Sequence, residues 1–89
     1  MKLVVTVVGK DRVGIIAMVS QILAESNVNI LSINQNILDG YFNMILLAEL
    51  SESKVKLADL QRKLKEEGKA INVDIKAQHE EIFDVMHNI

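Results

Sequence analysis

Residues 9–15, Gly-Lys-Asp-Arg-Val-Gly-Ile, bring charged side chains and a second glycine to a point where a strand gives way to a helix. The run before them is rich in β-branched residues, and the run after them is amphipathic. Asp11 is a residue type that caps helices, because its carboxylate accepts a hydrogen bond from an early helix N–H. Gly14 would then lie in the first turn, where the missing side chain exposes backbone N–H groups.

The chemistry of this turn suits a small zwitterion. The N-terminal end of a helix carries a partial positive charge and unpaired N–H groups, which suit a carboxylate or a phosphate. A carboxylate side chain beside those donors could receive an ammonium group. The residue types therefore indicate a pocket for an amino acid or a similar molecule. They also fit an ordinary capped helix whose glycine only permits close packing.

Hydrophobic periodicity predicts the elements that position this turn. Period-two and continuous apolar runs predict four strands, at residues 3–8, 30–38, 41–50 and 71–78. Helical spacing predicts helices at residues 13–26 and 54–67, with a short terminal helix at 79–89. Ser51 or Ser53 would cap the second helix, and Gly68 would end it. Asp39-Gly40 predicts a two-residue type I′ hairpin turn.

This order of elements predicts an α+β fold. It is the ferredoxin-like βαββαβ sandwich, with an antiparallel four-stranded sheet in the order 4-1-3-2 and a C-terminal helix. We expect one domain, residues 1–78, with residues 79–89 as its helical tail. Two helices cover only one face of such a sheet. Four apolar side chains would therefore form a patch on the open face, where the tail or a second copy of the chain would cover them: Val4, Val8, Ile45 and Leu47.

The second strand carries amides and a hydroxyl on one face. Ser32, Asn34 and Asn36 alternate along it, either as the solvated side of an edge strand or as the lining of a ligand site or dimer contact. Gln35 points the other way, among apolar residues, and is predicted to be a buried amide that needs hydrogen-bond partners.

Composition excludes several classes of protein. A chain of 89 residues with a net charge of −2 forms one domain and lacks the excess of Lys and Arg that a nucleic-acid surface needs. The aromatic content of 3% is too low for base-stacking strands. No apolar run approaches the ~20 residues that span a bilayer. With no cysteine there is no disulfide and no thiolate metal site, and we expect a cytoplasmic protein.

Catalytic and metal-binding patterns are weak. Glu80, Asp84 and His87 lie at helical spacing on the tail, with His79 one turn back, but such surface groups are typically only solvated. The sequence has no Ser-His-Asp grouping, no phosphate-binding P-loop and no nucleophilic cysteine. We therefore expect no enzyme activity, no metal and no cofactor.

A family resemblance rests on residues 9–30, GKDRVGIIAMVSQILAESNVNI. The pattern D-R-x-G-I, followed about one helix later by N-I, closely resembles the opening motif of ACT domains. The motif residues here are Asp11, Arg12, Gly14, Ile15 and Asn29 with Ile30, and the resemblance covers about residues 2–78. The hairpin at residues 34–47 looks like that of small stand-alone ACT proteins, and like the ACT segments of glycine-cleavage regulators and formyltetrahydrofolate deformylases. Val13 stands where many members carry proline.

The resemblance implies a βαββαβ regulatory module that binds an amino acid at the interface of two copies. We expect a non-enzymatic domain that binds a small amino-acid-like effector, acts on a partner protein and forms a homo-oligomer, with a dimer favoured. The resemblance implies an effector site at Lys10, Asp11, Arg12, Val13, Gly14 and Ile15, with Asn29 nearby. The alternative is an interaction module of the same fold that dimerises or docks to a partner without a ligand.

Overall fold

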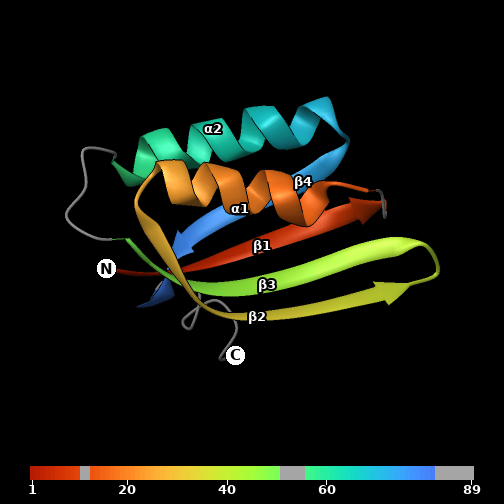
Figure 1. Ribbon diagram of the computed structural model, residues 1–89, viewed down its shortest axis with the longest axis horizontal. Helices are drawn as coiled ribbons and strands as arrows, with labels where there is room; N and C mark the ends of the chain where they lie inside the picture. Colours follow the sequence, from red (N-terminus) through yellow and green to blue (C-terminus); the bar gives the residue numbers. More distant parts are fainter. Residues whose placement is uncertain (11–12, 51–55, 82–89) are drawn as a thin grey trace.

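The computed structural model describes residues 1–10, 13–50 and 56–81. Four strands and two helices follow one another along the chain: β1 (Lys2–Lys10), α1 (Ile15–Glu25), β2 (Val28–Leu38), β3 (Tyr41–Leu50), α2 (Leu57–Ala70) and β4 (Val73–His79). The βαββαβ order is the predicted one (Figure 1). The predicted bounds of the third strand are confirmed without change, whereas the first two strands extend beyond their predicted ends.

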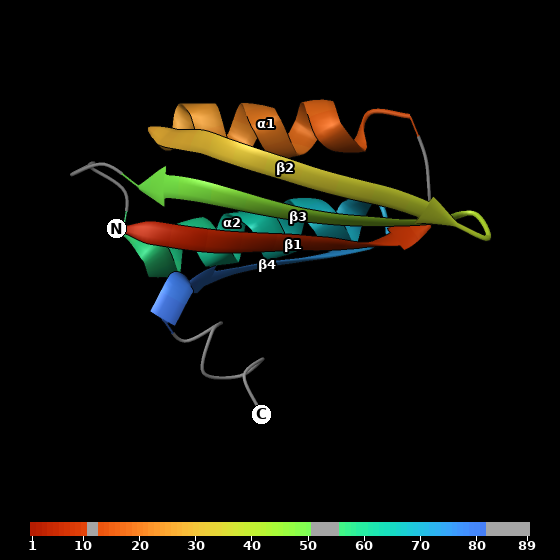
Figure 2. The same cartoon turned by 90° about the horizontal axis from the view of Figure 1, so that it is seen from below.

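The four strands form one antiparallel sheet in the order β2-β3-β1-β4, which is the predicted order. The two central strands are apolar on both faces, and the edge strand β4 is apolar only on the face toward the helices. Both helices lie on that same face (Figure 1). Seen from the other side, the four strands face the viewer, and α2 passes behind them (Figure 2).

The hydrophobic core lies between the sheet and the helices. Alternate side chains of β1 and β3, among them Val5 and Leu46, are fully buried against the apolar stripes of the helices. Leu23 of α1 and Leu64 of α2 are also inaccessible to solvent. Burial of a side chain of this size is worth about 1.5–3 kcal/mol. The core therefore fixes both helices on the sheet and fixes the turn that precedes α1.

The hairpin between β2 and β3 has the predicted turn. Asp39 and Gly40 both have positive φ, 53° and 78°, as the two central positions of a type I′ turn require. The flanking residues, Leu38 and Tyr41, are partners in the sheet register. This turn sets the register of β2 against β3 and so decides which groups of β2 face outward.

The ends of the helices differ from the prediction. The N-cap of α1 is Gly14, with φ of 96°, and not Asp11, which lies outside the described residues together with Arg12. The helix α2 has Lys56 at its N-cap and no side-chain cap, so it begins after the two predicted serines, Ser51 and Ser53, which lie in the undescribed stretch 51–55. Gly68 does not end α2, since the helix continues to Ala70.

Gly68 lies inside α2 because the helix passes very close to β4. A Cβ atom placed on it would lie 2.7 Å from the carbonyl oxygen of Val73. Glycine at this position allows α2 to approach β4 closely. It does not end the helix, as the sequence suggested. At the C-terminal end, His79 belongs to β4, and the predicted tail helix falls on residues 82–89, which lie outside the described residues.

Candidate functional site

The turn before α1 presents backbone donors at an exposed site. Gly14 is in the left-handed region and nothing lies within 4 Å of where its Cβ would be. The first hydrogen bond of the helix runs from the N–H of Met18 to the carbonyl oxygen of Gly14, at 2.9 Å. The N–H groups of residues 15–17 precede that bond and have no partner within the helix. The turn therefore offers donors and a partial positive charge to solvent.

The predicted site residues around this turn differ in what they can contact. Lys10 ends β1 and is exposed, and Val13 is 99% exposed, so both side chains are free to meet a ligand. Ile15 is only 1% exposed and packs in the core, so its side chain cannot contribute to a site. Its predicted role is therefore limited to its backbone N–H and to anchoring the helix.

Asn29 is not brought to this turn within one chain. It pairs with Glu49 in the sheet, and Glu49 pairs with Lys2, at the start of β1. The turn follows Lys10, at the other end of that strand. Lys2 and Lys10 are eight residues apart along the extended strand, which is roughly 27 Å. The prediction that Asn29 lies near residues 10–14 is wrong for a single copy.

The edge strand β2 has an exposed apolar row that the sequence did not predict. Ile33 and Ile37 lie on the helix side of the sheet, by their pairing with Leu46 and Phe42, yet they are 47% and 55% exposed. Leu31, at the bulge in the pairing, is also exposed. Gln35, predicted to be buried, is exposed as well. The C-terminal half of β2 extends beyond the part of the sheet that α1 covers (Figure 1).

The backbone of β2 also faces outward along this row. Leu38 and Tyr41 flank a two-residue turn, so they form a hydrogen-bonded pair. Hydrogen bonding to the neighbour alternates along an antiparallel strand. The N–H and C=O groups of Ile33, Gln35 and Ile37 therefore point away from β3, toward solvent. The β2 edge, defined here by these three residues, is an unpaired strand edge with apolar side chains.

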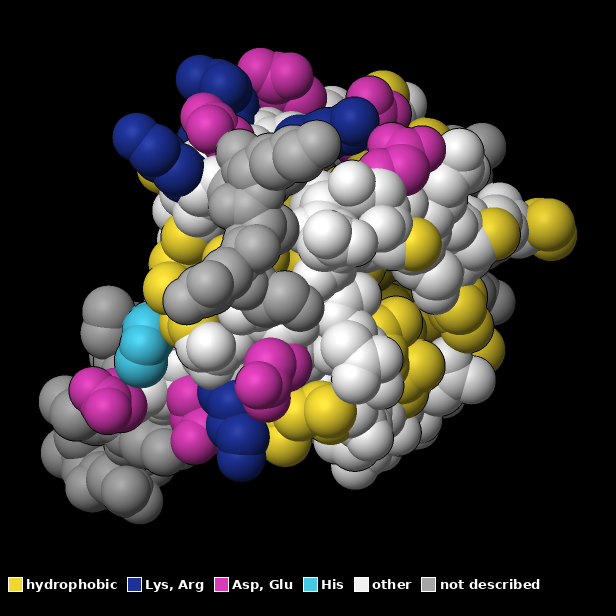
Figure 3. Space-filling view, turned by 60° about the vertical axis from the view of Figure 1, so that its left-hand side comes forward, with side chains coloured by type: hydrophobic (Ala, Val, Ile, Leu, Met, Phe, Trp, Pro, Cys, Tyr) yellow, Lys and Arg dark blue, Asp and Glu magenta, His cyan; other side chains and the backbone are white. Residues whose placement is uncertain are grey.

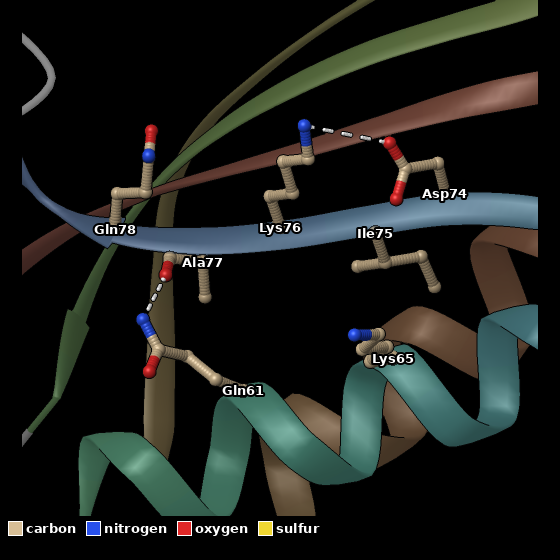
Figure 4. Close-up of a pocket in the computed structure, with 7 residues that line it drawn as sticks. All are labelled: Gln61, Lys65, Asp74, Ile75, Lys76, Ala77 and Gln78. Carbon is tan, nitrogen blue, oxygen red and sulfur yellow. Dashed lines mark hydrogen bonds and ion pairs between the residues drawn. The ribbon is translucent and has the colours of Figure 1, made fainter.

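The opposite edge of the sheet is covered by α2. Gln61 donates a 2.7 Å hydrogen bond from Nε2 to the carbonyl oxygen of Ala77, and Gly68 packs on the carbonyl of Val73. A groove of about 330 Å³ remains between these two contacts, with Ile75 at its floor and Lys65 beside it (Figure 4). Asp74 and Lys76 point away from α2 and lie 3.7 Å apart (Figure 4).

The open face of the sheet carries part of the predicted apolar patch. Val8 and Ile45 are about half exposed, at 47% and 50%, and Leu47 is half-buried. Val4 is only 7% exposed, so it adds little surface. Ser32, Asn34 and Asn36 are exposed at the margin of this face, as predicted.

Charged side chains gather at the top of the view in Figure 3, and a second charged group lies lower down beside hydrophobic side chains. Lys63 of α2 donates to Glu25 of α1 at 3.4 Å, and Arg62 pairs with Asp59 at 3.0 Å. Among residues 1–10, 13–50 and 56–81, no three His, Asp or Glu side chains gather as metal ligands would. Asp84 and His87, weighed as metal ligands, lie outside those ranges. No helix in the same ranges is long and apolar enough to span a bilayer.

Comparison with known proteins agrees with this arrangement. The family model for the ACT domain matches residues 1–78. The chain belongs to the ACT domain family. A UPF0237 protein of Clostridium perfringens is 53% identical over 89 residues, covering the whole of both chains. An ACT domain protein from Streptococcus pneumoniae is 40% identical, with a TM-score of 0.81 and 94% of each chain covered.

The predicted likeness to deformylase ACT segments is also confirmed, at the level of the fold. A formyltetrahydrofolate deformylase from Pseudomonas putida matches 89% of this chain and 29% of its own, with a TM-score of 0.80 and 14% identity. ACT domains form a regulatory, ligand-binding family.

Proposed function

We propose that this ACT domain is a cytoplasmic, non-enzymatic sensor that binds a small amino-acid-like effector between two copies and acts on a partner protein. The effector's carboxylate would lie at the exposed N–H groups of the turn at Gly14, with Lys10 and Val13 beside it. Asp11 and Arg12 belong to this proposed site through the family motif alone. What supports the turn as the anchor is its exposed, left-handed glycine followed by unpaired helix donors.

The observation that carries the proposal is the separation of Asn29 from the turn. Antiparallel pairing of two β2 edges about a two-fold axis near Ile33 would bring Asn29 of one copy level with Ile37 of the other. Ile37 pairs with Phe42, and Phe42 pairs with Gly9, directly before Lys10. A two-fold dimer through the β2 edge would thus bring the two halves of the motif to the same level of the sheet. The unpaired backbone and the exposed apolar row of that edge support such pairing.

A thermal-shift screen of the twenty amino acids tests whether an effector binds. A ligand that binds only the folded state adds about 2.7 kcal/mol to the free energy of unfolding at a hundredfold excess over its Kd, and so raises the melting temperature. We expect saturable stabilisation by one amino acid or a close group of them. If none of the twenty amino acids raises the melting temperature, the alternative is favoured, an interaction module without a ligand.

Two variants then locate the site on the turn. Gly14→Val places a branched side chain in the open space beside the helix donors and should abolish the shift. Gly40→Val is its matched control, since Gly40 also has positive φ and empty surroundings. Both variants carry backbone strain of about 1–3 kcal/mol. Binding that survives in Gly14→Val as well as in Gly40→Val would place the site elsewhere.

Mixing two inactive variants tests whether the site is shared between copies. Gly14→Val and Asn29→Ala should each lose binding alone. In a randomly mixed two-fold dimer, about a quarter of the sites would combine an intact turn with an intact Asn29 from the other chain. Recovery of that fraction by calorimetric titration supports a shared site, and no recovery contradicts it.

A further inference from the structure

The backbone of β4 points outward at Ile75. Hydrogen bonding alternates along each strand, so Phe42, which follows the hairpin pair, bonds to Gly9 of β1. The preceding residue of β1, Val8, then bonds to Asp74 of β4. Ile75 comes directly after Asp74, and its N–H and C=O therefore point away from β1, toward the edge of the sheet.

The helix α2 covers the outward groups on both sides of Ile75. Gln61 donates to the carbonyl oxygen of Ala77 at 2.7 Å, and Gly68 packs on the carbonyl of Val73. Among the residues that the structure describes, none donates to the C=O of Ile75 or accepts from its N–H. The groove of about 330 Å³ lies at this residue (Figure 4). It therefore presents one backbone donor and one backbone acceptor, as a single residue of an open strand does.

Lys65 adds a positive charge to the groove. It lies on α2 between Gln61 and Gly68, beside Ile75 (Figure 4). No ion pair among the described residues includes it. The residues three and four positions away on the helix, where an acid could pair with it, are neutral or basic: Gln61, Arg62, Gly68 and Lys69. Its ammonium group is therefore available to an anion.

The acidic residue that lines the groove does not face α2. Asp74 points away from the helix and pairs with Lys76 at 3.7 Å (Figure 4). The ammonium group of a free amino acid would therefore meet the like charge of Lys65 without a carboxylate to balance it. An amide N–H is neutral and meets no such repulsion. The groove thus favours a carboxylate whose neighbouring nitrogen belongs to a peptide bond.

The space favours a chain end over a strand that runs through it. A longer strand would need the outward groups of Val73 and Ala77, which α2 covers. Pockets for small ligands run from ~300 to ~1,000 Å³, so a volume of about 330 Å³ suits one or two residues. An antiparallel chain that ends here would direct its carboxylate toward Val73, and Lys69 lines an adjoining hollow on that side.

We propose that this groove binds the C-terminal residue of a partner protein. The carboxylate of that residue would accept hydrogen bonds from the N–H of Ile75 and from Nζ of Lys65, and its amide N–H would donate to the C=O of Ile75. Two facing residues of an antiparallel ladder exchange the same pair of backbone bonds. The groove shares no residue with the turn at Gly14 or with the β2 edge, so this contact is independent of the effector site.

A blocked peptide, acetyl-Ala-Ala-Val with a free carboxylate, tests the proposal by titration into the isotope-labelled chain. We expect a saturable change in the amide resonance of Ile75 at millimolar peptide. The same peptide ending in a carboxamide should bind about tenfold more weakly, because it lacks the charge-assisted bond to Lys65. Absence of a change with the free carboxylate, or equal binding of the carboxamide, would overturn the proposal.

Acetate and free valine identify the source of the carboxylate. Acetate lacks the amide N–H, and valine has an ammonium group in its place, so both should bind several-fold more weakly than the peptide. Equal binding of acetate would mean an anion site only, and equal binding of valine would mean an amino-acid site; either result would overturn the proposal. No effector is added in these titrations, so a failure here is distinguishable from a failure of the effector screen.

Two variants of α2 test the role of Lys65. Lys65→Met keeps the length of the side chain but removes the ammonium group, and it should weaken peptide binding about tenfold. Lys63→Met is the control, because Lys63 pairs with Glu25 of α1 at 3.4 Å and lies outside the groove. It should leave the affinity within about twofold, since exposed ion pairs contribute little to the fold. Circular dichroism checks that both variants stay folded. Equal binding by the two variants would contradict the proposal.

Discussion

The two edges of the sheet differ in whether their outward backbone groups are covered. Every sheet edge exposes unpaired backbone groups, which can pair with another chain. On β4, the helix α2 leans over the edge, and Gln61 occupies the carbonyl of Ala77. On β2, the strand runs past α1, and its outward backbone stays uncovered beside Ile33 and Ile37. Within the part of the chain that the structure describes, the β2 edge is therefore open to pairing with another strand, whereas the β4 edge is covered.

The largest effect is expected where α2 closes on β4. Gly68→Ala would place a Cβ 2.7 Å from the carbonyl oxygen of Val73 and 3.0 Å from the side chain of Ile75. Overpacking of this kind costs about 1–3 kcal/mol, and alanine recovers about 1 kcal/mol of helix propensity. Because a backbone oxygen cannot rotate away, we expect a net loss of about 1–2 kcal/mol in the free energy of unfolding, measured by urea denaturation.

The neighbouring residue Glu67 provides the control for Gly68→Ala. It is exposed on the same turn of α2, so Glu67→Ala should change the free energy of unfolding by less than about 0.5 kcal/mol. If Gly68→Ala is as stable as Glu67→Ala, α2 does not hold the β4 edge closed.

A smaller effect is expected from the hydrogen bond that covers β4. Gln61→Met keeps the length of the side chain but leaves the carbonyl oxygen of Ala77 without its 2.7 Å donor. Loss of such a bond costs about 1 kcal/mol. The uncovered edge should also promote slow association at high protein concentration, which size-exclusion chromatography would detect.

Arg62→Ala distinguishes this effect from a general change in α2. Its ion pair with Asp59, at 3.0 Å, joins side chains that are 69% and 51% exposed. Exposed pairs contribute between 0 and about 1 kcal/mol, so we expect little change in stability and no association. Association in both variants to the same extent would mean that Gln61 has no special role at the edge.

The sequence predicted the fold because its strongest signals are local. Asp and Gly are residue types that accept positive φ, so Asp39-Gly40 identifies its own turn. The regular alternation of β4 likewise matches its single buried face. The helix ends were predicted less well, because Gly14 and Gly68 each allow more than one explanation. Only the structure shows that Gly14 is an N-cap and that Gly68 permits α2 to approach Val73.

The candidate site was only half predictable for a similar reason. Lys10, Val13 and Gly14 are adjacent in sequence, and a turn keeps them adjacent in space. The position of Asn29 depends on the direction and length of β2, which place it at the end of the sheet away from the turn. The exposure of Gln35 depends on how far α1 extends along β2. The apolar side chains around Gln35 do not reveal that length. The apolar pattern alone does not separate a buried strand from an exposed edge strand.

Amide hydrogen exchange in β2 tests whether this edge pairs with a second copy. The outward N–H groups of Ile33, Gln35 and Ile37 should exchange slowly at micromolar concentration. Those of Ile33 and Ile37 should exchange faster in a Gln35→Pro variant, which lacks the donor between them and cannot pair. The inward N–H groups of Asn34 and Asn36 bond to β3 in either case and serve as the internal reference. Slow exchange of the outward groups that is lost in Gln35→Pro is the result we predict. Fast exchange of the outward groups in the parent protein would mean that the β2 edge does not pair.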